Sequence, residues 1–260
     1  MVEHIPPSQV VFALLMAAVG AWGFAQSDFV AIWAPGIRPA EMRAVMVYAC
    51  SLVSVIAGLG LLRERFRIVS ARLLLGFLCL WLIWCKGPPL VRAPGELVAF
   101  ESLSETLVPA AAALAISGVA FGVAAARLLY GLALIAFGAA HLGYLAETAS
   151  LVPAWLPWHE GWVYLTAATY VAAGIALLIA RFARQAAALS AVQMALFGLL
   201  VWLPKVAAGA LDRDTLNEAA ISFALAASGW VVASALADQS RARDGPAREL
   251  APSSGSINSA

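Results

Sequence analysis

The chain has 260 residues, of which 63% are hydrophobic and only 12% are charged, and its formal net charge is +1. A soluble domain of this length cannot bury so much apolar surface, so the composition excludes a soluble globular protein. No basic soluble domain of the kind that binds nucleic acid is present, so nucleic acid is not an expected partner. Membrane lipids are the expected surroundings.

Long apolar runs divide the chain into eight candidate membrane spans. A bilayer core of about 30 Å needs roughly 20 apolar residues in each helix. Runs of this kind occur at residues 9–26, 44–62, 69–85, 104–124, 127–146, 162–180, 186–204 and 215–237. They are rich in Ala and Leu and lack the alternating pattern of barrel strands. We therefore predict an all-α polytopic membrane protein with about eight transmembrane helices.

The two ends of the chain need separate interpretation. One interpretation of residues 1–26 is a cleaved signal peptide, but only Glu3 and His4 precede the apolar run, and the usual basic segment is missing. We therefore keep residues 9–26 as the first span. Residues 238–260 are rich in Ser, Arg, Ala, Gly and Pro, which predicts a disordered cytoplasmic tail.

Charges and tryptophans predict the orientation of the spans. With a cytoplasmic N-terminus, ten of the sixteen basic residues lie inside: Arg63, Arg65, Arg67, Arg72, Arg127, Arg181, Arg184, Arg241, Arg243 and Arg248. This bias predicts a multi-pass protein of the plasma or inner membrane with both termini in the cytoplasm. Eight of the nine tryptophans then fall near the outer ends of spans, at the expected headgroup level: Trp22, Trp33, Trp81, Trp84, Trp155, Trp158, Trp162 and Trp202.

The spans fall into two similar halves. The stretch "YACSLVSVIAGLGLLRER" from Tyr48 matches "YLTAATYVAAGIALLIAR" from Tyr164 at its Tyr, Ala-Gly, Leu-Leu and Arg positions. Upstream, Gly20, Pro35 and Pro39 match three later residues at similar spacing: Gly138, Pro153 and Pro157. An even number of helices in each half predicts parallel repeats related by an axis along the membrane normal. The predicted repeats are residues 1–125 and 126–237.

The second half resembles a known family. Residues 127–181 contain Arg127, Gly131, Gly138, His141, the "VPAWLP" segment, Tyr164, Gly174 and Arg181 in an order and spacing similar to the four-helix DoxX family. The first half resembles a degenerate copy, with Gly23 where the second has His141. The family is named after membrane subunits associated with thiosulfate:quinone oxidoreduction. The resemblance therefore implies a quinone-linked role, with a redox partner protein supplying electrons.

His141 is the candidate catalytic residue. It shares one helix face with Arg127, Gly131, Leu134 and Gly138, of which the glycines allow close helix packing. A histidine near its unperturbed pKa can pass a proton or donate to a quinone carbonyl. The alternative is a packing role, through a hydrogen bond between helices to a carbonyl or to Tyr164. A ligand pocket around His141 is predicted to include five further residues: Tyr144, Tyr164, Trp155, Trp158 and His159.

Other charged residues carry weaker hypotheses. Glu105 and Glu218 occupy equivalent places near the start of the fourth and eighth spans, with Lys86 and Lys205 at the ends of the preceding spans. Ion pairs at the membrane interface are the simplest interpretation, and an outer vestibule for protons or substrate is the functional one. Asp28, with Glu41 and Arg43, is expected to be solvated.

Three function classes remain open. The first is a quinone-interacting membrane subunit of an oxidoreductase system, the second a non-enzymatic anchor or assembly partner, and the third a small-solute transporter. The sequence has no haem, flavin or metal-binding motif, so no resident cofactor or metal is predicted and a bound quinone is the one implied by the resemblance. Whether the protein is an enzyme, and its oligomeric state, are left open.

Overall fold

The computed structural model describes residues 5–35 and 41–249, with side chains described to residue 242. Eight helices in this part of the chain are long and apolar enough to cross a membrane, and the same residues contain no β-strand. The predicted all-α polytopic architecture is confirmed. The protein is therefore an integral membrane protein, surrounded by lipid.

Six of the spans are single helices. They are α1 (Pro7–Gln26), α2 (Arg43–Leu61), α5 (Leu97–Ile116), α6 (Gly122–Gly143), α8 (His159–Leu178) and α11 (Arg213–Glu249). Two short helices lie in the connections between spans, a 3₁₀ turn at Ala31–Trp33 and α7 at Leu145–Leu151.

The third span of each half is interrupted by a π-helical segment. In the first half, α3 (Glu64–Trp81) continues through a π segment, η2 (Leu82–Lys86), into α4 (Gly87–Arg92). In the second half, α9 (Ala183–Phe197) continues through η3 (Gly198–Trp202) into α10 (Leu203–Ala207). A proline at the start of α4 and of α10 lacks the backbone N–H that a regular helix would use, and this accounts for the local change of helix type.

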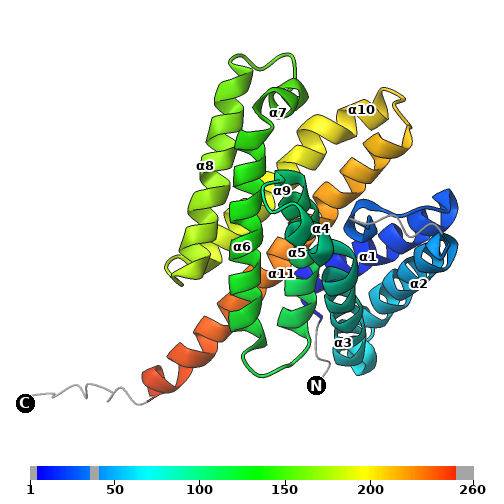
Figure 1. Ribbon diagram of the computed structural model, residues 1–260. Coiled ribbons are helices and arrows are strands. Elements are labelled where there is room, and N and C mark those ends of the chain that lie inside the picture. The colour runs from blue at the N-terminus through cyan, green and yellow to red at the C-terminus, as the bar shows by residue number, and fades with distance from the viewer. Residues whose placement is uncertain (1–4, 36–40, 250–260) are drawn as a thin grey trace, which may run out of the picture.

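The helices of the two halves pack by the same plan. Helix α1 packs along α2 as α6 packs along α8, and the last helix of each half packs against the first helix of the other, α5 on α6 and α11 on α1. Helices α5 and α11 meet in the middle (Figure 1). This arrangement agrees with a duplication of parallel repeats. Both termini lie on one face, called here the termini face, and the α7 turn lies on the opposite, far face (Figure 1). The cytoplasmic location of the termini stays a prediction.

Equivalent glycines permit the close pairs of helices. A Cβ atom at Gly20 would lie 2.5 Å from the carbonyl oxygen of Ser51 in α2, and one at Gly138 would lie 2.9 Å from that of Ala167 in α8. Such distances leave no room for a side chain, so the two helix pairs require glycine. The predicted close packing at Gly138 is confirmed.

The C-terminal helix is longer than predicted. Helix α11 continues to Glu249, whereas we predicted disorder from residue 238. An ion pair between Arg241 and Asp238 at 3.2 Å, one helical turn apart, supports this extension, and Ala and Arg are good helix formers. The remainder of the predicted tail, residues 250–260, lies outside the described residues.

Candidate functional site

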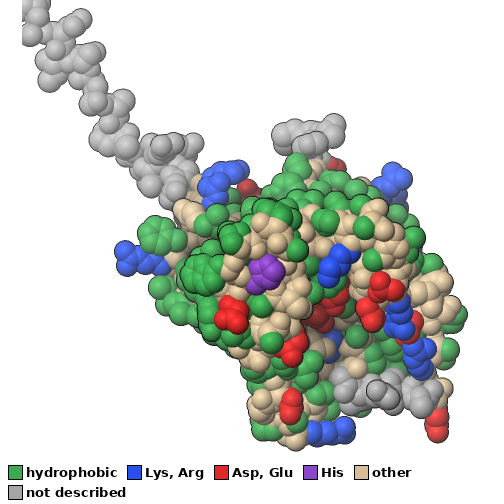
Figure 2. Space-filling view, turned by 90° about the horizontal axis from the view of Figure 1, so that it is seen from above, with side chains coloured by type: hydrophobic (Ala, Val, Ile, Leu, Met, Phe, Trp, Pro, Cys, Tyr) green, Lys and Arg blue, Asp and Glu red, His purple; other side chains and the backbone are tan. Residues whose placement is uncertain are grey.

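A small cavity bordered mainly by helices of the second half collects several titratable side chains. It has a volume of about 110 Å³ and lies between α5, α6, α8, α9 and α11, near the far face. Its polar walls are Glu101, Glu105, His141, Tyr170 and Glu218. We call it the inner cavity. Figure 2 views the far face and shows acidic side chains around a hollow near its middle.

His141 presents an unpaired nitrogen to this cavity. Its Nδ1 lies 2.9 Å from the carbonyl oxygen of Phe137, and because a carbonyl oxygen only accepts, Nδ1 carries the hydrogen. The neutral ring then has an acceptor at Nε2, which is buried and has no hydrogen-bond partner among the described residues. The rings of Tyr170 and Phe197 pack edge-on against the imidazole, with centroids 5.4 and 5.6 Å away. His141 is thus held in orientation with one nitrogen free.

The first half of the chain contributes charge to the same site. Glu105 lies on α5 and interacts electrostatically with Lys86, Glu101 and Glu218. Lys86 ends η2, is almost fully buried, and donates a hydrogen bond from Nζ to the Ser102 hydroxyl at 2.6 Å. The predicted interface-level ion pair does not form among the described residues, because Lys86 lies inside the bundle and bonds to Ser102 instead of making a salt bridge with Glu105.

Among the residues that the structure describes, the corresponding lysine and glutamate of the second half form no salt bridge either. Lys205 lies over the ring of Trp202, 4.5 Å from its centroid, and makes no salt bridge with Glu218 within the described part of the chain. Glu218 instead lines the inner cavity. The proline in α10, Pro204, stands two residues after Trp202, and Lys205 directly after it is exposed.

These groups suit proton exchange better than metal binding. Across the described ranges, no three His, Cys, Asp or Glu side chains lie close enough together to hold a metal ion. Three carboxyl groups line the cavity, and the Lys86 ammonium interacts electrostatically with one of them, in a medium where an uncompensated charge is costly. Binding of protons is one way to neutralise the excess negative charge. The arrangement is therefore chemically suited to proton exchange.

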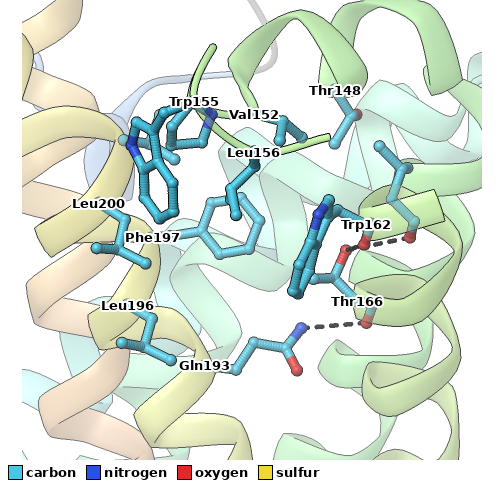
Figure 3. Close-up of a pocket in the computed structure, with 13 residues that line it drawn as sticks. Thr148, Val152, Trp155, Leu156, Trp162, Thr166, Gln193, Leu196, Phe197 and Leu200 are labelled. Carbon is cyan, nitrogen blue, oxygen red and sulfur yellow. Dashed lines mark hydrogen bonds between the residues drawn. The ribbon is translucent and has the colours of Figure 1, made fainter. Parts of the chain in front are cut away.

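A second hollow opens sideways towards the lipid. It has a volume of about 250 Å³ and lies between the turn after α7, helix α8 and helix α9 (Figure 3). Trp155 is 70% exposed and covers one end, and Trp162 stands on the α8 side. Polar atoms come from Thr166 and Gln193, whose side-chain amide donates to the Thr166 carbonyl at 3.1 Å. We call this hollow the lateral groove.

Phe197 separates the lateral groove from the inner cavity. Its ring lines both, and it packs against His141 on the cavity side. It is the last residue of α9, and η3 begins at the next residue, Gly198. A Cβ atom at Gly198 would lie 2.7 Å from the Phe223 ring, so a side chain there would displace this ring. π segments often mark functional sites because they shift side chains out of the regular helical register.

The remaining predicted site residues are divided between several places. Trp155 lines the lateral groove, while Trp158 and Tyr164 line a separate exposed hollow beside Gly161. Tyr144 caps α6, and His159 begins α8, and neither lines the inner cavity or the groove in the part of the chain that the structure describes. The turn from 152 to 158 folds over α8 and α9, whereas His141 faces the interior.

Sequence reasoning missed three contributors to the site. Glu101 lies one helical turn before Glu105, a spacing that puts both on one face of α5, but the predicted span began after it. Tyr170 and Phe197 had no sequence signal that distinguished them from packing residues.

The first half fills the place of the inner cavity with Trp33. Trp33 is 2% exposed and donates from its indole nitrogen to the Ser54 hydroxyl at 2.8 Å. It packs edge-on against Trp81, with ring centroids 5.7 Å apart. Trp33 stands two residues before Pro35, as Leu151 stands two before the aligned Pro153, and Leu151 lines the inner cavity. The predicted headgroup location of Trp33 is wrong, because Ser54 gives its N–H a partner inside the bundle.

Asp28 is also buried rather than solvated. Its carboxylate pairs with Arg43 and with Arg213, and its side chain is only 10% exposed. Arg213 begins α11 of the second half, so this carboxylate joins the two halves at the far face. The expectation that Asp28 is solvated was wrong. Its partner Arg213 is distant in the sequence, so the sequence alone gave no sign of this pair.

The chain has no significant match among protein-family models, curated proteins or solved structures. The resemblance to the DoxX family therefore stays a prediction that depends on the residues quoted for it.

Proposed function

We propose that the protein is a membrane subunit that binds a lipid-soluble, proton-exchanging ring compound of the quinone class. In this proposal the ring enters the lateral groove from the bilayer, and its protons pass through the inner cavity. The single observation that carries the proposal is the position of Phe197, which forms a wall of both spaces. A lipid-accessible site and a protonatable site thus meet at one side chain.

The lateral groove suits a planar ring with an apolar tail. Its volume of about 250 Å³ and its tryptophan and phenylalanine walls favour aromatic stacking. Leu196 and Leu200, which border the groove, are exposed on the membrane surface of the protein, so a tail can remain in lipid. The amide of Gln193 also accepts from Thr169 at 2.6 Å and is a polar partner for a ring carbonyl.

The inner cavity suits the proton side of quinone chemistry. Reduction of a quinone to a quinol takes up two electrons and two protons, and oxidation releases them. The Nε2 atom of His141 and the carboxyl groups of Glu101, Glu105 and Glu218 are groups that can exchange those protons with the far face. The electrons come from a partner protein in this proposal, since the sequence has no motif for a redox cofactor.

Binding of a short-tailed benzoquinone tests the proposal. The ligand retained by the purified protein in detergent micelles is measured by extraction and absorbance. We expect Trp155→Ala to weaken binding about tenfold, since a stacked aromatic contact of about 1 kcal/mol is lost with its buried area. Trp158→Ala is the matched control, because this tryptophan belongs to the same turn and is 80% exposed but lies outside the groove.

Equal binding by the wild type, Trp155→Ala and Phe197→Ala would contradict the proposal. That result would favour the anchor or assembly role, for which no ligand is needed. Loss of binding in the Trp158→Ala control as well would place the ligand on the exposed side of the turn and would also contradict a site in the lateral groove.

A further inference from the structure

A basic hollow lies at the termini face of the second half, at the opposite end of the bundle from the inner cavity. Its volume is about 600 Å³, and it lies between the start of α6, the turn from α8 to α9, and the end of α11. We call it the basic pocket. The side chains with polar groups that line it are Arg127, Arg184, Gln185, Gln239 and Ser240.

Arg127 is fixed in the wall of the basic pocket. Its Nη1 donates to the carbonyl oxygens of Leu177 and Leu178, the last residues of α8, the latter at 3.0 Å. A guanidinium has five N–H donors, and these two bonds use only one of its nitrogens. The other donors of Arg127 remain for a ligand, already oriented by the contact with α8.

The arginines of the basic pocket have no carboxylate partner. Within the described residues, salt bridges involve only Asp28 and Asp238 as acids. Asp238 precedes Gln239 on α11, but its carboxylate pairs with Arg241 at 3.2 Å. Among the side chains that the structure describes, no acidic one lines the basic pocket. The pocket thus has two positive charges that an anion can neutralise.

The basic pocket lies where lipid headgroups lie. Ile179 and Phe182, in the turn beside it, are 63% and 65% exposed, as expected for side chains that contact acyl chains. Residues of the next helical turn, Ala183, Arg184 and Gln185, begin α9 and line the pocket, so its polar wall follows directly after the apolar edge. A ligand that fits both has an anionic head and an apolar body.

We infer that the basic pocket binds the phosphate group of an anionic phospholipid. Arginines match phosphate oxygens with paired hydrogen bonds, and basic pockets between transmembrane helices are typical sites for such headgroups. The glutamine and serine side chains are further donors for the headgroup. The acyl chains lie along Ile179 and Phe182. The site is separate from the proposed quinone chemistry and does not depend on it.

The first half has lost this pair of arginines. Counted from the aligned Gly20 and Gly138, Arg127 corresponds to Gln9, and counted from the aligned Arg65 and Arg181, Arg184 corresponds to Ile68. Arg65 lies over the ring of Phe66 in the equivalent turn of the first half. If the termini face needed only positive charge and no lipid site, Arg65 would serve as well as Arg184. Arg65 therefore supplies a matched control.

Retention of phosphatidylglycerol tests the inference. The full-length protein in maltoside micelles is equilibrated with phosphatidylglycerol or phosphatidylcholine, washed, and examined by native mass spectrometry for bound lipid. We expect the wild type and Arg65→Gln to retain phosphatidylglycerol in preference to phosphatidylcholine. We expect Arg184→Gln to bind it about tenfold more weakly and Arg184→Glu to lose it, since a charge-assisted hydrogen bond contributes about 1.5–3 kcal/mol.

Two results would overturn the inference. One is equal retention by the wild type and both Arg184 variants, since folding does not depend on this exposed side chain. The other is displacement of the bound lipid by millimolar inorganic phosphate at constant ionic strength, which would make the basic pocket a site for the free anion. Arg127→Gln tests the second arginine of the pocket in the same lipid-retention measurement. Its unfolding temperature is compared with that of Arg65→Gln, so that a loss of lipid is not mistaken for a loss of folding.

Discussion

The two halves of this protein share a helix-packing plan but differ in what fills their interiors. In the first half, the indole of Trp33 occupies the space between helices and bonds to Ser54. In the second half, Leu151 stands in the corresponding place and the inner cavity remains open. Because a packed indole fills this place in the first half, the fold does not require a cavity there. The second half differs at this place, where Leu151 borders the inner cavity.

The difference extends to the side chains around that space. Gly23 corresponds to His141, and a Cβ atom at Gly23 would lie 2.4 Å from the Ser51 hydroxyl, so the first half has no room for a histidine. Ser54 corresponds to Tyr170 when counted from the aligned tyrosines. Gly23, Trp33 and Ser54 of the first half thus correspond to three residues that line the inner cavity, His141, Leu151 and Tyr170.

The charged side chains at the inner cavity come from both halves of the chain. Lys86 and Glu105 belong to the first half, but Glu105 lines the cavity of the second. Lys86 ends η2, and the residue that ends η3 is Trp202. The first half therefore places the ammonium of Lys86 beside α5, whereas the second half has the uncharged ring of Trp202 at the matching position. The charges around the central helices α5 and α11 are thus not symmetric.

Replacing Trp33 should have the largest effect on stability. Trp33→Ala removes a buried indole and leaves Ser54 without its partner, and we expect a loss of about 3–5 kcal/mol in the free energy of unfolding. Leu151→Ala, at the corresponding place, should cost less than about 2 kcal/mol because Leu151 borders an existing cavity. Denaturant titration in lipid–detergent micelles measures both. Equal losses would mean that the two interiors are packed alike.

Removing the carboxylate of Glu105 should have the next largest effect. Glu105→Gln removes the carboxylate that interacts electrostatically with the buried ammonium of Lys86, and we expect a loss of about 3 kcal/mol in the free energy of unfolding. Glu218→Gln should be nearly neutral for stability, since Trp202 stands where the first half has Lys86. The same titration measures both variants.

A double variant checks the cause. Lys86→Met combined with Glu105→Gln should recover most of the lost stability, because both charges are then absent. Additive losses in the double variant would show that Lys86 and Glu105 do not act as a pair.

Substitution of His141 should affect function more than stability. His141→Ala should lower quinone-linked proton uptake about a hundredfold, a typical contribution of a positioned acid or base, with little change in unfolding. His141→Gln can still hydrogen-bond and should retain part of the benzoquinone binding without the proton transfer. Proton uptake by proteoliposomes, followed with a pH-sensitive dye, measures the effect. Unchanged uptake in both variants would leave His141 as a packing residue.

Most of the architecture could be predicted because it depends on local properties. The eight spans follow from the length of each apolar run against the thickness of a bilayer. The close packing at Gly138 follows from helical spacing and the absence of a side chain. The candidate role of His141 rests on the rarity of such residues in membrane helices. None of these inferences requires knowledge of which helices are neighbours.

The site itself was decided by tertiary packing. Lys86, the pair of Glu101 and Glu105, and Glu218 come from three separate places in the sequence, and only the approach of η2 and α11 to α5 brings them together. Asp28 meets Arg213 in the same way. Whether Trp33 lies at the membrane surface or inside depends on a hydrogen-bond partner one helix away. Hydropathy reports the average surroundings of a segment, whereas the cavity depends on the volume and direction of single side chains from helices distant in sequence.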